Sequence, residues 1–302
     1  MITKFGEIAA LVTAFSWTAA AMIFESASKR AGVTAVNTLK VLFGTIYLAI
    51  LALFLNNHIF PFDLPVKTWL FMSASGIIGF VVGDYFLFNA YLLIGSRISM
   101  LLMSASVPMT AIASYFIFKE SISSWGGYGI ALAIIGISIT VVGGKQKKQS
   151  TDEAHVHSDY IKGIIFGIMS AIAMAMGTLL TKVGAADVSA IAATQVRIMS
   201  ALVGFIIFTI VFGRTNEIIS AIKNKQSMLY IAIGSIFGPF IGVGALLYAL
   251  QHAKAGVVST ISSLTPILII APSIIFFKKK VTFMEITGAF IAVGGISLLF
   301  IY

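Results

Sequence analysis

The stretch "NAYLLIGSRISMLLMSASVPM", residues 89–109, has a counterpart in "YALQHAKAGVVSTISSLTPI", residues 248–267. With a one-residue gap between the two, Pro108 aligns with Pro266. Two further pairs match on either side of this one: "VNTLKVLFG" (36–44) with "ATQVRIMSA" (193–201), and "GIALAIIG" (129–136) with "GAFIAVGG" (288–295). The order and spacing of the matches predict that the chain contains one structural unit twice.

An alternative is that apolar helices resemble one another by composition alone. Two features argue against it. The prolines align, and the flanking match places Lys40 opposite Arg197, so a cation is repeated inside an apolar stretch. Neither feature is expected from generic apolar sequence, and we therefore favour a true repeat.

The composition is typical of an integral membrane protein. Of the 302 residues, 59% are hydrophobic and only 10% are charged, whereas soluble domains have about 45–50% apolar and about 25% charged residues. A membrane-spanning helix needs about 20 mostly apolar residues. Ten such segments are predicted, and together they leave no room for a soluble domain: 7–28, 34–55, 69–93, 98–118, 125–143, 161–181, 188–212, 228–250, 256–277 and 283–301.

A polar stretch, "GGKQKKQSTDEAHVHSDY" at 143–160, divides these segments into two groups of five. We predict a first repeat at 1–143, a polar linker at 144–160 and a second repeat at 161–302. Because five is odd, the second repeat must lie inverted in the membrane. Inverted repeats are typical of transporters, whose binding site lies near the midplane between the two halves.

The chain resembles the EamA-type transporters of the drug/metabolite transporter superfamily over nearly its whole length. The resemblance rests on the G-x-x-x-G-D approach to Asp84, the spacing Ala90–Pro108–Glu120, and a weaker echo in the second half. It implies an all-α fold of ten transmembrane helices in two inverted five-helix repeats. One departure is that Lys278–Lys280 stand where such repeats often carry an acidic residue like Glu120.

Four charged residues lie well inside the apolar segments: Glu25, Lys40, Asp84 and Arg197. Each costs about 2.5–3.5 kcal/mol at a helix centre on insertion scales, so such residues normally face a cavity or each other. At 100° per residue, Ser73 falls on the same helical line as Asp84. This stripe predicts a cavity wall, and we expect Asp84, Lys40 and Arg197 to bind substrate.

Polar and aromatic residues on the neighbouring segments complete the predicted substrate site: Asn37, Tyr91, Trp17, Tyr248 and Gln251. Helix breaks and close packing that would permit gating are predicted at Pro108, Pro266, Gly79 and Gly83, because paired helix interruptions mark transporter sites.

Structural alternatives remain open for these residues. Asp84 is also explained as an ion-pair partner of Lys40 or Arg197, and both cations are near enough to helix ends to reach an interface. Glu25 is near a helix end, which favours an interfacial position. Pro266 and its neighbouring serines are also explained by helix packing around a proline kink.

Several function classes are disfavoured. There is no Cys, no G-x-x-x-x-G-K-[ST] motif and no credible nucleophile–base pair, so we expect neither an enzyme nor a bound cofactor. The net charge of +9 lies mostly in loops between spans, which indicates lipid headgroups rather than nucleic acid. His155 and His157 are an alternative metal site, but they lack a closed ligand set, so no metal is predicted.

The sequence thus predicts a secondary transporter in the cell membrane, an exporter of small metabolites such as amino acids, because a cavity with a carboxylate and cations suits a zwitterion. Its expected partners are a small-molecule solute and the lipid bilayer, and proton coupling through Asp84 is a hypothesis. The alternative substrate is an organic or quaternary ammonium cation, held in a cage of Trp17, Tyr91 and Asp84. A membrane receptor or enzyme is a third and weaker alternative.

Overall fold

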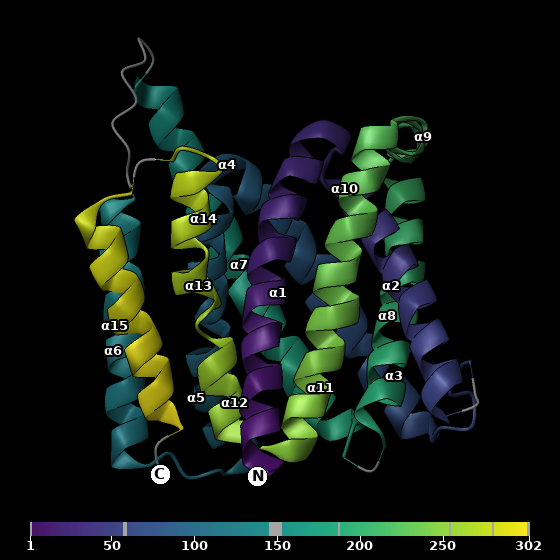
Figure 1. The fold of residues 1–302 in the computed structure, drawn as a ribbon, viewed down its shortest axis with the longest axis horizontal. Helices are drawn as coiled ribbons and strands as arrows, with labels where there is room; N and C mark the ends of the chain where they lie inside the picture. The colour runs from purple at the N-terminus through teal and green to yellow at the C-terminus, as the bar shows by residue number, and fades with distance from the viewer. Residues whose placement is uncertain are drawn as a thin grey trace.

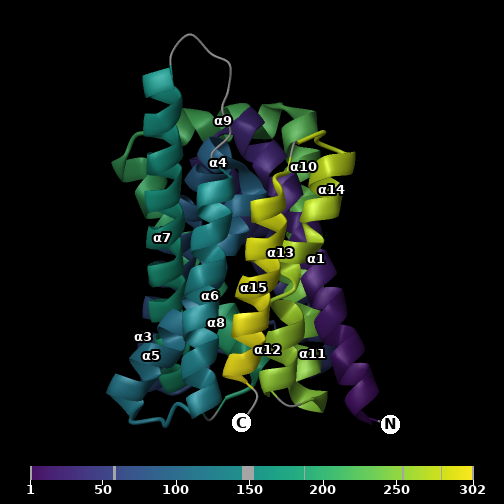
Figure 2. The same cartoon turned by 90° about the vertical axis from the view of Figure 1, so that its left-hand side faces the viewer.

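The computed structural model describes residues 2–56, 59–144, 153–186, 188–253, 255–279 and 281–300. These residues form helices and connecting turns, with no strand among them. Most helices run along one common direction, whereas α9 (Thr215–Lys223) lies across one end of the bundle (Figures 1 and 2). Both ends of the chain lie at the opposite end of the bundle (Figure 1).

The elements of the first half follow the expected segments. They are α1 (Ile2–Ala31), α2 (Val33–Asn56), α3 (Val66–Ser75), η1 (Gly76–Gly83), α4 (Asp84–Ser104), α5 (Ser106–Phe118) and α6 (Ser124–Gly143). The second half has the same succession with one added helix, α9, and with the counterparts of α4 and α5 each divided into two shorter helices. Its other elements are α7 (Glu153–Gly184), α8 (Ala190–Val211), α10 (Lys225–Ser235), η2 (Ile236–Gly242), α11 (Val243–His252), α12 (Ala255–Ser262), α13 (Thr265–Leu268), α14 (Ile270–Ile275) and α15 (Phe283–Leu299).

Among the described residues, eight helical segments are long and apolar enough to cross a membrane, judged by length and composition, and α15 is a shorter apolar helix. The longest segment is Val66–Phe118, with 53 residues. Gly95 interrupts it with φ 80° and ψ 160°, a conformation that is not helical and is open essentially only to glycine. Figures 1 and 2 place α3 and α5 near one end of the bundle and α4 nearer the other, so the chain reverses within this segment.

The described part of the chain has two π-helical segments, one in each half. η1 has the sequence GIIGFVVG and η2 has the sequence IFGPFIG. They begin 160 residues apart, and each passes directly into the next α-helix, at Asp84 and at Val243. π-Helical turns are rare and are frequent at functional sites. Their recurrence at matching places is a structural repeat that the sequence comparison did not reveal.

The π-helix η1 also changes the expected polar stripe. The eleven-residue interval from Ser73 to Asp84 contains all of η1, in which the 100° rotation per residue does not hold. Ser73 accepts a hydrogen bond from Ser200 of α8 at 2.8 Å, so its polar partner is on another helix. The helical-wheel argument that joined Ser73 to Asp84 therefore does not apply.

Small residues allow α6 and α15 to pack with their backbones nearly in contact. A Cβ atom on Gly136 would lie 2.2 Å from the backbone nitrogen of Ala292, and one on Gly295 would lie 2.4 Å from the nitrogen of Ala133. Close approach through small residues is how transmembrane helices associate without a hydrophobic driving force. This pair joins the last helix of one half to the last helix of the other.

The first helix of each half packs against the π-helical segment of the other half. α1 contacts η2 and α11, and α7 contacts η1 and α4, while α2 packs against α8. At Gly177 of α7, an added Cβ would lie 3.1 Å from the Cα of Gly79 in η1. The two halves are thus interlocked rather than side by side, which brings residues from both to the middle of the bundle.

One helix and one helix boundary differ from the expected ones. α9 was not expected, because its nine residues are too few to span a membrane. α7 begins at Glu153, inside the polar stretch that divides the halves. Large apolar side chains such as Phe54, 81% exposed, and Phe283, 78% exposed, cover the outside of the bundle, as expected for a surface in contact with lipid.

Candidate functional site

A buried ion pair lies between α2 and α4. The Lys40 Nζ atom is 2.5 Å from the Asp84 Oδ2 atom, and each side chain is only 10% exposed. Asp84 occupies the first position after η1, so the π-helix positions this carboxylate directly. The pair joins two of the residues that the sequence assigned to substrate binding, and it matches the structural alternative in which Lys40 neutralises Asp84.

Aromatic rings and an amide surround the pair. The Lys40 ammonium group lies 4.6 Å from the centre of the Phe88 ring and 5.8 Å from that of Phe24. Ring faces attract cations, and they do so more strongly when water is excluded. Asn37 donates a hydrogen bond to the Asp84 carbonyl at 3.4 Å. The Asn37 Oδ1 atom is buried and has no hydrogen-bond partner within the described part of the chain.

Arg197 is on α8 and lies against η1. Its guanidinium group lies 4.7 Å from the centre of the Phe80 ring in η1, and a Cβ on Gly79 would lie 3.3 Å from its Nη2 atom. Among the described residues the Arg197 side chain makes no hydrogen bond or ion pair, and its Nε atom is buried. Asp84 acts on it electrostatically through space. Arg197 is therefore a cation whose hydrogen-bonding capacity is unused in this conformation.

Tyr91 is buried and Trp17 is half-buried, and the contacts described for both are with groups other than Lys40 and Asp84. Tyr91 is 2% exposed, and its hydroxyl group donates to the Met100 sulfur at 3.1 Å. Its ring stacks on Phe88, with centres 5.1 Å apart, which connects it to the Lys40–Asp84 pair. The Trp17 Nε1 atom lies against Gly242, the last residue of η2, where an added Cβ would be 2.6 Å away.

Tyr248 is on the outer surface of α11. It is 45% exposed, and its ring stacks on His252 with centres 4.0 Å apart. Nothing in the geometry brings it to the Lys40–Asp84 pair. The backbone of Gln251 belongs to α11, and its side chain lies outside the described part of the structure.

The predicted helix-break residues lie next to interruptions of their helices. α4 ends at Ser104 and α5 begins at Ser106, two residues before Pro108. In the second half, α12 ends at Ser262 and α13 begins one residue before Pro266. Proline cannot donate to the carbonyl four residues earlier and clashes with it, which explains breaks at these positions. Gly79 and Gly83 lie in η1 and provide the close contact with α7.

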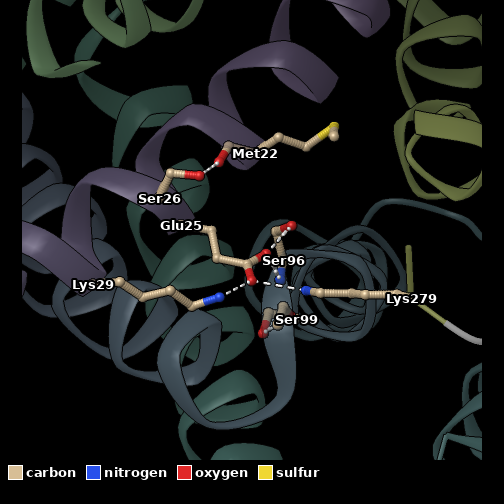
Figure 3. Close-up of polar contacts among 8 residues, drawn as sticks. Met22, Glu25, Ser26, Lys29, Ser96, Ser99 and Lys279 are labelled. Atoms are coloured by element: carbon tan, nitrogen blue, oxygen red, sulfur yellow. Dashed lines mark hydrogen bonds and ion pairs between the residues drawn. The ribbon is translucent and has the colours of Figure 1, made fainter. Parts of the chain in front are cut away.

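A second buried carboxylate, Glu25, holds α1 to two other parts of the chain (Figure 3). It is 1% exposed, because other parts of the chain cover it near the end of α1. Its Oε1 atom lies 2.6 Å from Lys29 Nζ and 2.8 Å from Lys279 Nζ. Its Oε2 atom accepts hydrogen bonds from the Ser96 backbone N–H at 2.8 Å and from the Ser96 hydroxyl group at 2.6 Å.

Sequence reasoning missed several of these residues. Phe88 is one helical turn after Asp84, so the spacing contained a signal. A buried ion pair between Arg97 and Glu285 was also missed, because both residues fell at the predicted ends of spans. No group of three His, Asp or Glu side chains suited to a metal occurs in the residues that the structure describes. The side chain of His155 lies outside those residues.

Comparison with known proteins agrees with this architecture. A protein of known crystal structure, 14% identical in sequence, superposes with a TM-score of 0.65 over 97% of this chain and 95% of its own, which shows a shared fold. An uncharacterized protein of Methanocaldococcus jannaschii is 30% identical over 138 residues, which are 45% of this chain and 94% of that protein.

The EamA-like transporter family matches the chain twice, at residues 4–142 and 161–301. The two matches together include nearly all the helices, and the polar stretch at 143–160 separates them. This is a family of membrane transporters with small-molecule solutes, as the resemblance in the sequence implied. The chain therefore belongs to the EamA-like transporter family.

Proposed function

We propose that the protein is a secondary transporter that exports small zwitterionic metabolites such as amino acids across the cell membrane. The observation that carries the proposal is the buried Lys40–Asp84 ion pair, together with Arg197, which has no ion-pair partner among the described residues. A zwitterion carries both charges of this pair. Its ammonium group can replace Lys40 on Asp84, while its carboxylate takes Lys40 or Arg197. When the carboxylate takes Lys40, such an exchange adds no unpaired buried charge to the one already present on Arg197, and an added unpaired charge would be costly.

The proposed topology is ten transmembrane helices in two inverted repeats, at 1–143 and 161–302, joined by a polar linker at 144–160. The two family matches, the paired π-helices and the mutual packing of the first helices against the opposite π-segments support it. Counting Val66–Phe118 as two crossings at Gly95, and α15 as one, gives ten. Alternating access then consists of rocking motions around the breaks near Pro108 and Pro266.

An organic cation is the second candidate substrate. The Lys40 ammonium group already lies against the faces of Phe24 and Phe88, and a quaternary ammonium group would favour the same rings. The aromatic groups at the pair are thus phenylalanines rather than the predicted cage of Trp17 and Tyr91. We favour the zwitterion, because a bound cation would displace Lys40 and leave its positive charge buried.

Proton coupling is part of the proposal. Asp84 can exchange Lys40 for a proton as well as for a substrate ammonium group. Export by proteoliposomes under an imposed proton gradient measures this directly. Gradient-dependent transport that is unchanged in an active Asp84→Asn variant would remove Asp84 from the role.

The test of substrate class is ligand-induced thermal stabilisation of purified protein with a panel of amino acids and quaternary ammonium compounds. A ligand at 100 times its Kd adds about 2.7 kcal/mol to the stability of the folded state. We expect amino acids to stabilise the wild type and to lose this effect in Asp84→Asn and Lys40→Gln. Arg214→Gln is the matched control, because Arg214 forms an exposed ion pair with Glu217.

Radiolabelled counterflow in proteoliposomes then identifies which stabilising ligands are transported. Stabilisation by quaternary ammonium compounds alone would support the second candidate. Equal stabilisation of wild type and both variants by one ligand would place the binding site elsewhere.

A further inference from the structure

Two non-glycine residues in the described chain have a positive φ angle: Lys119 (57°) and Lys278 (48°). They are 159 residues apart, and they follow α5 and α14, the final helices before α6 and α15. A left-handed conformation is unfavourable for a residue with a side chain. The same unfavourable conformation thus recurs at matching points of the two halves, which indicates a geometry that both positions require.

The residue after each of these lysines forms an ion pair with the opposite half. Glu120, after Lys119, pairs with Lys182 near the end of α7. Lys279, after Lys278, pairs with Glu25 near the end of α1. Glu25 and Lys182 are 157 residues apart, the same offset that relates Lys40 to Arg197. The two ion pairs are therefore equivalent in the repeat, with their charges reversed.

These two ion pairs lie at opposite ends of the bundle. α14, which precedes Lys279, is near the upper end in both views, and α5, which precedes Glu120, is near the lower end (Figures 1 and 2). Each pair connects the first helix of one half to the connection before the last helix of the other half. Both are placed to hold the two halves together at one end of the bundle.

The two pairs differ in their surroundings. Glu25 is 1% exposed and Lys279 27%, and Glu25 also accepts from Lys29 and from Ser96 (Figure 3). The absence of a side chain at Gly95 leaves room for Lys279, since an added Cβ would lie 2.7 Å from its Nζ atom. In contrast, the Lys182 and Glu120 side chains are 44% and 49% exposed. Water screens an exposed pair, so it contributes little and breaks readily.

We propose that Glu25–Lys279 and Lys182–Glu120 are the two gates of the transport cycle, one at each end of the central Lys40–Asp84 pair. The inference rests on the proposed transport function. In this conformation the Glu25 gate is closed and shielded from water, whereas the Lys182 gate is solvated and ready to open. When the halves rock, the Glu25 carboxylate loses Lys279, and the Lys182–Glu120 contact becomes the tighter one.

The chain contains no Cys, so pairs of introduced cysteines carry spin labels only at the chosen positions. For the Glu25 end, the labels are placed at Arg30, near the end of α1, and at Phe283 of α15, so that one lies in each half and both are exposed. For the other end, they are placed at Ser121 and Ala186, both exposed. Pulsed dipolar spectroscopy of protein in lipid nanodiscs reports the distance distribution at each end without any substrate.

We expect Glu25→Gln and Lys279→Gln to raise the population with the longer distance at the Glu25 end by about tenfold, a shift in a two-state equilibrium. Lys279→Gln leaves Glu25 bonded to Ser96 and Lys29, so it tests the gate even if Glu25→Gln does not fold. At the other end, Lys182→Glu is expected to open the gate by repulsion from Glu120. The double variant Lys182→Glu/Glu120→Lys is expected to restore the wild-type distances, and Arg214→Gln is expected to change neither end.

Wild-type distance distributions in all these variants would contradict the proposed gating role of the two ion pairs. So would a Lys182→Glu/Glu120→Lys variant that remains as open as Lys182→Glu, because the effect would then not depend on the pair. Counterflow on the same samples distinguishes this failure from failure of the proposed function. Absence of transport by the wild type refutes the function, whereas normal transport with unchanged distances refutes only the gates.

Discussion

Breaking the Lys40–Asp84 ion pair is expected to destabilise the protein strongly, and replacing both partners is not. At 2.5 Å and an effective dielectric constant of about 20, the gross Coulomb attraction is about 6–7 kcal/mol. Desolvation of two side chains that are 90% covered offsets most of it. Removing one partner keeps the desolvation cost of the other, so Asp84→Leu and Lys40→Met are each expected to cost about 3–5 kcal/mol.

The double variant Lys40→Met/Asp84→Leu removes both buried charges and fills the space with apolar side chains. Its stability is expected within about 1 kcal/mol of the wild type, or above it, because well-packed apolar groups often replace a buried ion pair without loss. Phe24 and Phe88 already provide apolar contacts there. The single variants and the double variant should therefore be strongly non-additive.

Equilibrium unfolding in mixed detergent micelles measures the four free energies, with Arg214→Gln as an exposed-pair control expected to cost less than about 1 kcal/mol. Counterflow on the same proteins separates structure from function. A stable double variant that transports nothing would support a substrate role for the pair. A double variant that loses as much stability as the two single variants added together would refute the ion-pair reasoning.

Four other substitutions test packing, helix capping and backbone conformation. Gly136→Ala is expected to cost about 1–3 kcal/mol of stability, because its Cβ would lie 2.2 Å from the backbone of α15. Gly127→Ala has nothing within 4 Å of the added Cβ and should be neutral or stabilising by about 0.5–1 kcal/mol. Thermal unfolding compares the two variants. Thr282→Ala should cost about 1 kcal/mol in the same assay, because it removes the capping box of α15, and an unchanged midpoint would contradict that role. Gly95→Ala should cost about 1–3 kcal/mol from its φ of 80° and ψ of 160°, and should lengthen the distance at the Glu25 end; unaltered distances would show that the turn does not hold that contact.

The sequence was sufficient for the membrane class and for the repeat. Runs of about 20 apolar residues are a one-dimensional signal, because a helix in lipid satisfies its own backbone hydrogen bonds. The matched prolines and the pairing of Lys40 with Arg197 in the alignment carry the repeat in the same way. The family match at 4–142 and 161–301 agrees with what these residues implied.

Local geometry was less predictable. The π-helices η1 and η2 change the rotation between residues, so a helical wheel drawn through them misplaces every residue beyond, as happened with Ser73 and Asp84. α9 was missed, because only runs of about 20 apolar residues were expected to be helices, and this helix has nine residues. The burial of Glu25 was missed for another reason, since its position near a helix end says nothing about what packs over it.

Contacts between distant parts of the chain were decided by the tertiary structure alone. The sequence supplied Asp84, Lys40 and Arg197 as costly charges, but Asp84 could pair with either cation, and only packing selects one. Lys40 reaches Asp84 because η1 places that carboxylate against α2, while Arg197 is held over Phe80 instead. Likewise, Glu25 and Lys279 are 254 residues apart and meet only because α1 packs into the opposite half. Apolarity is a property of each segment, but neutralising a buried charge is a property of its neighbours, and those are set when the helices pack.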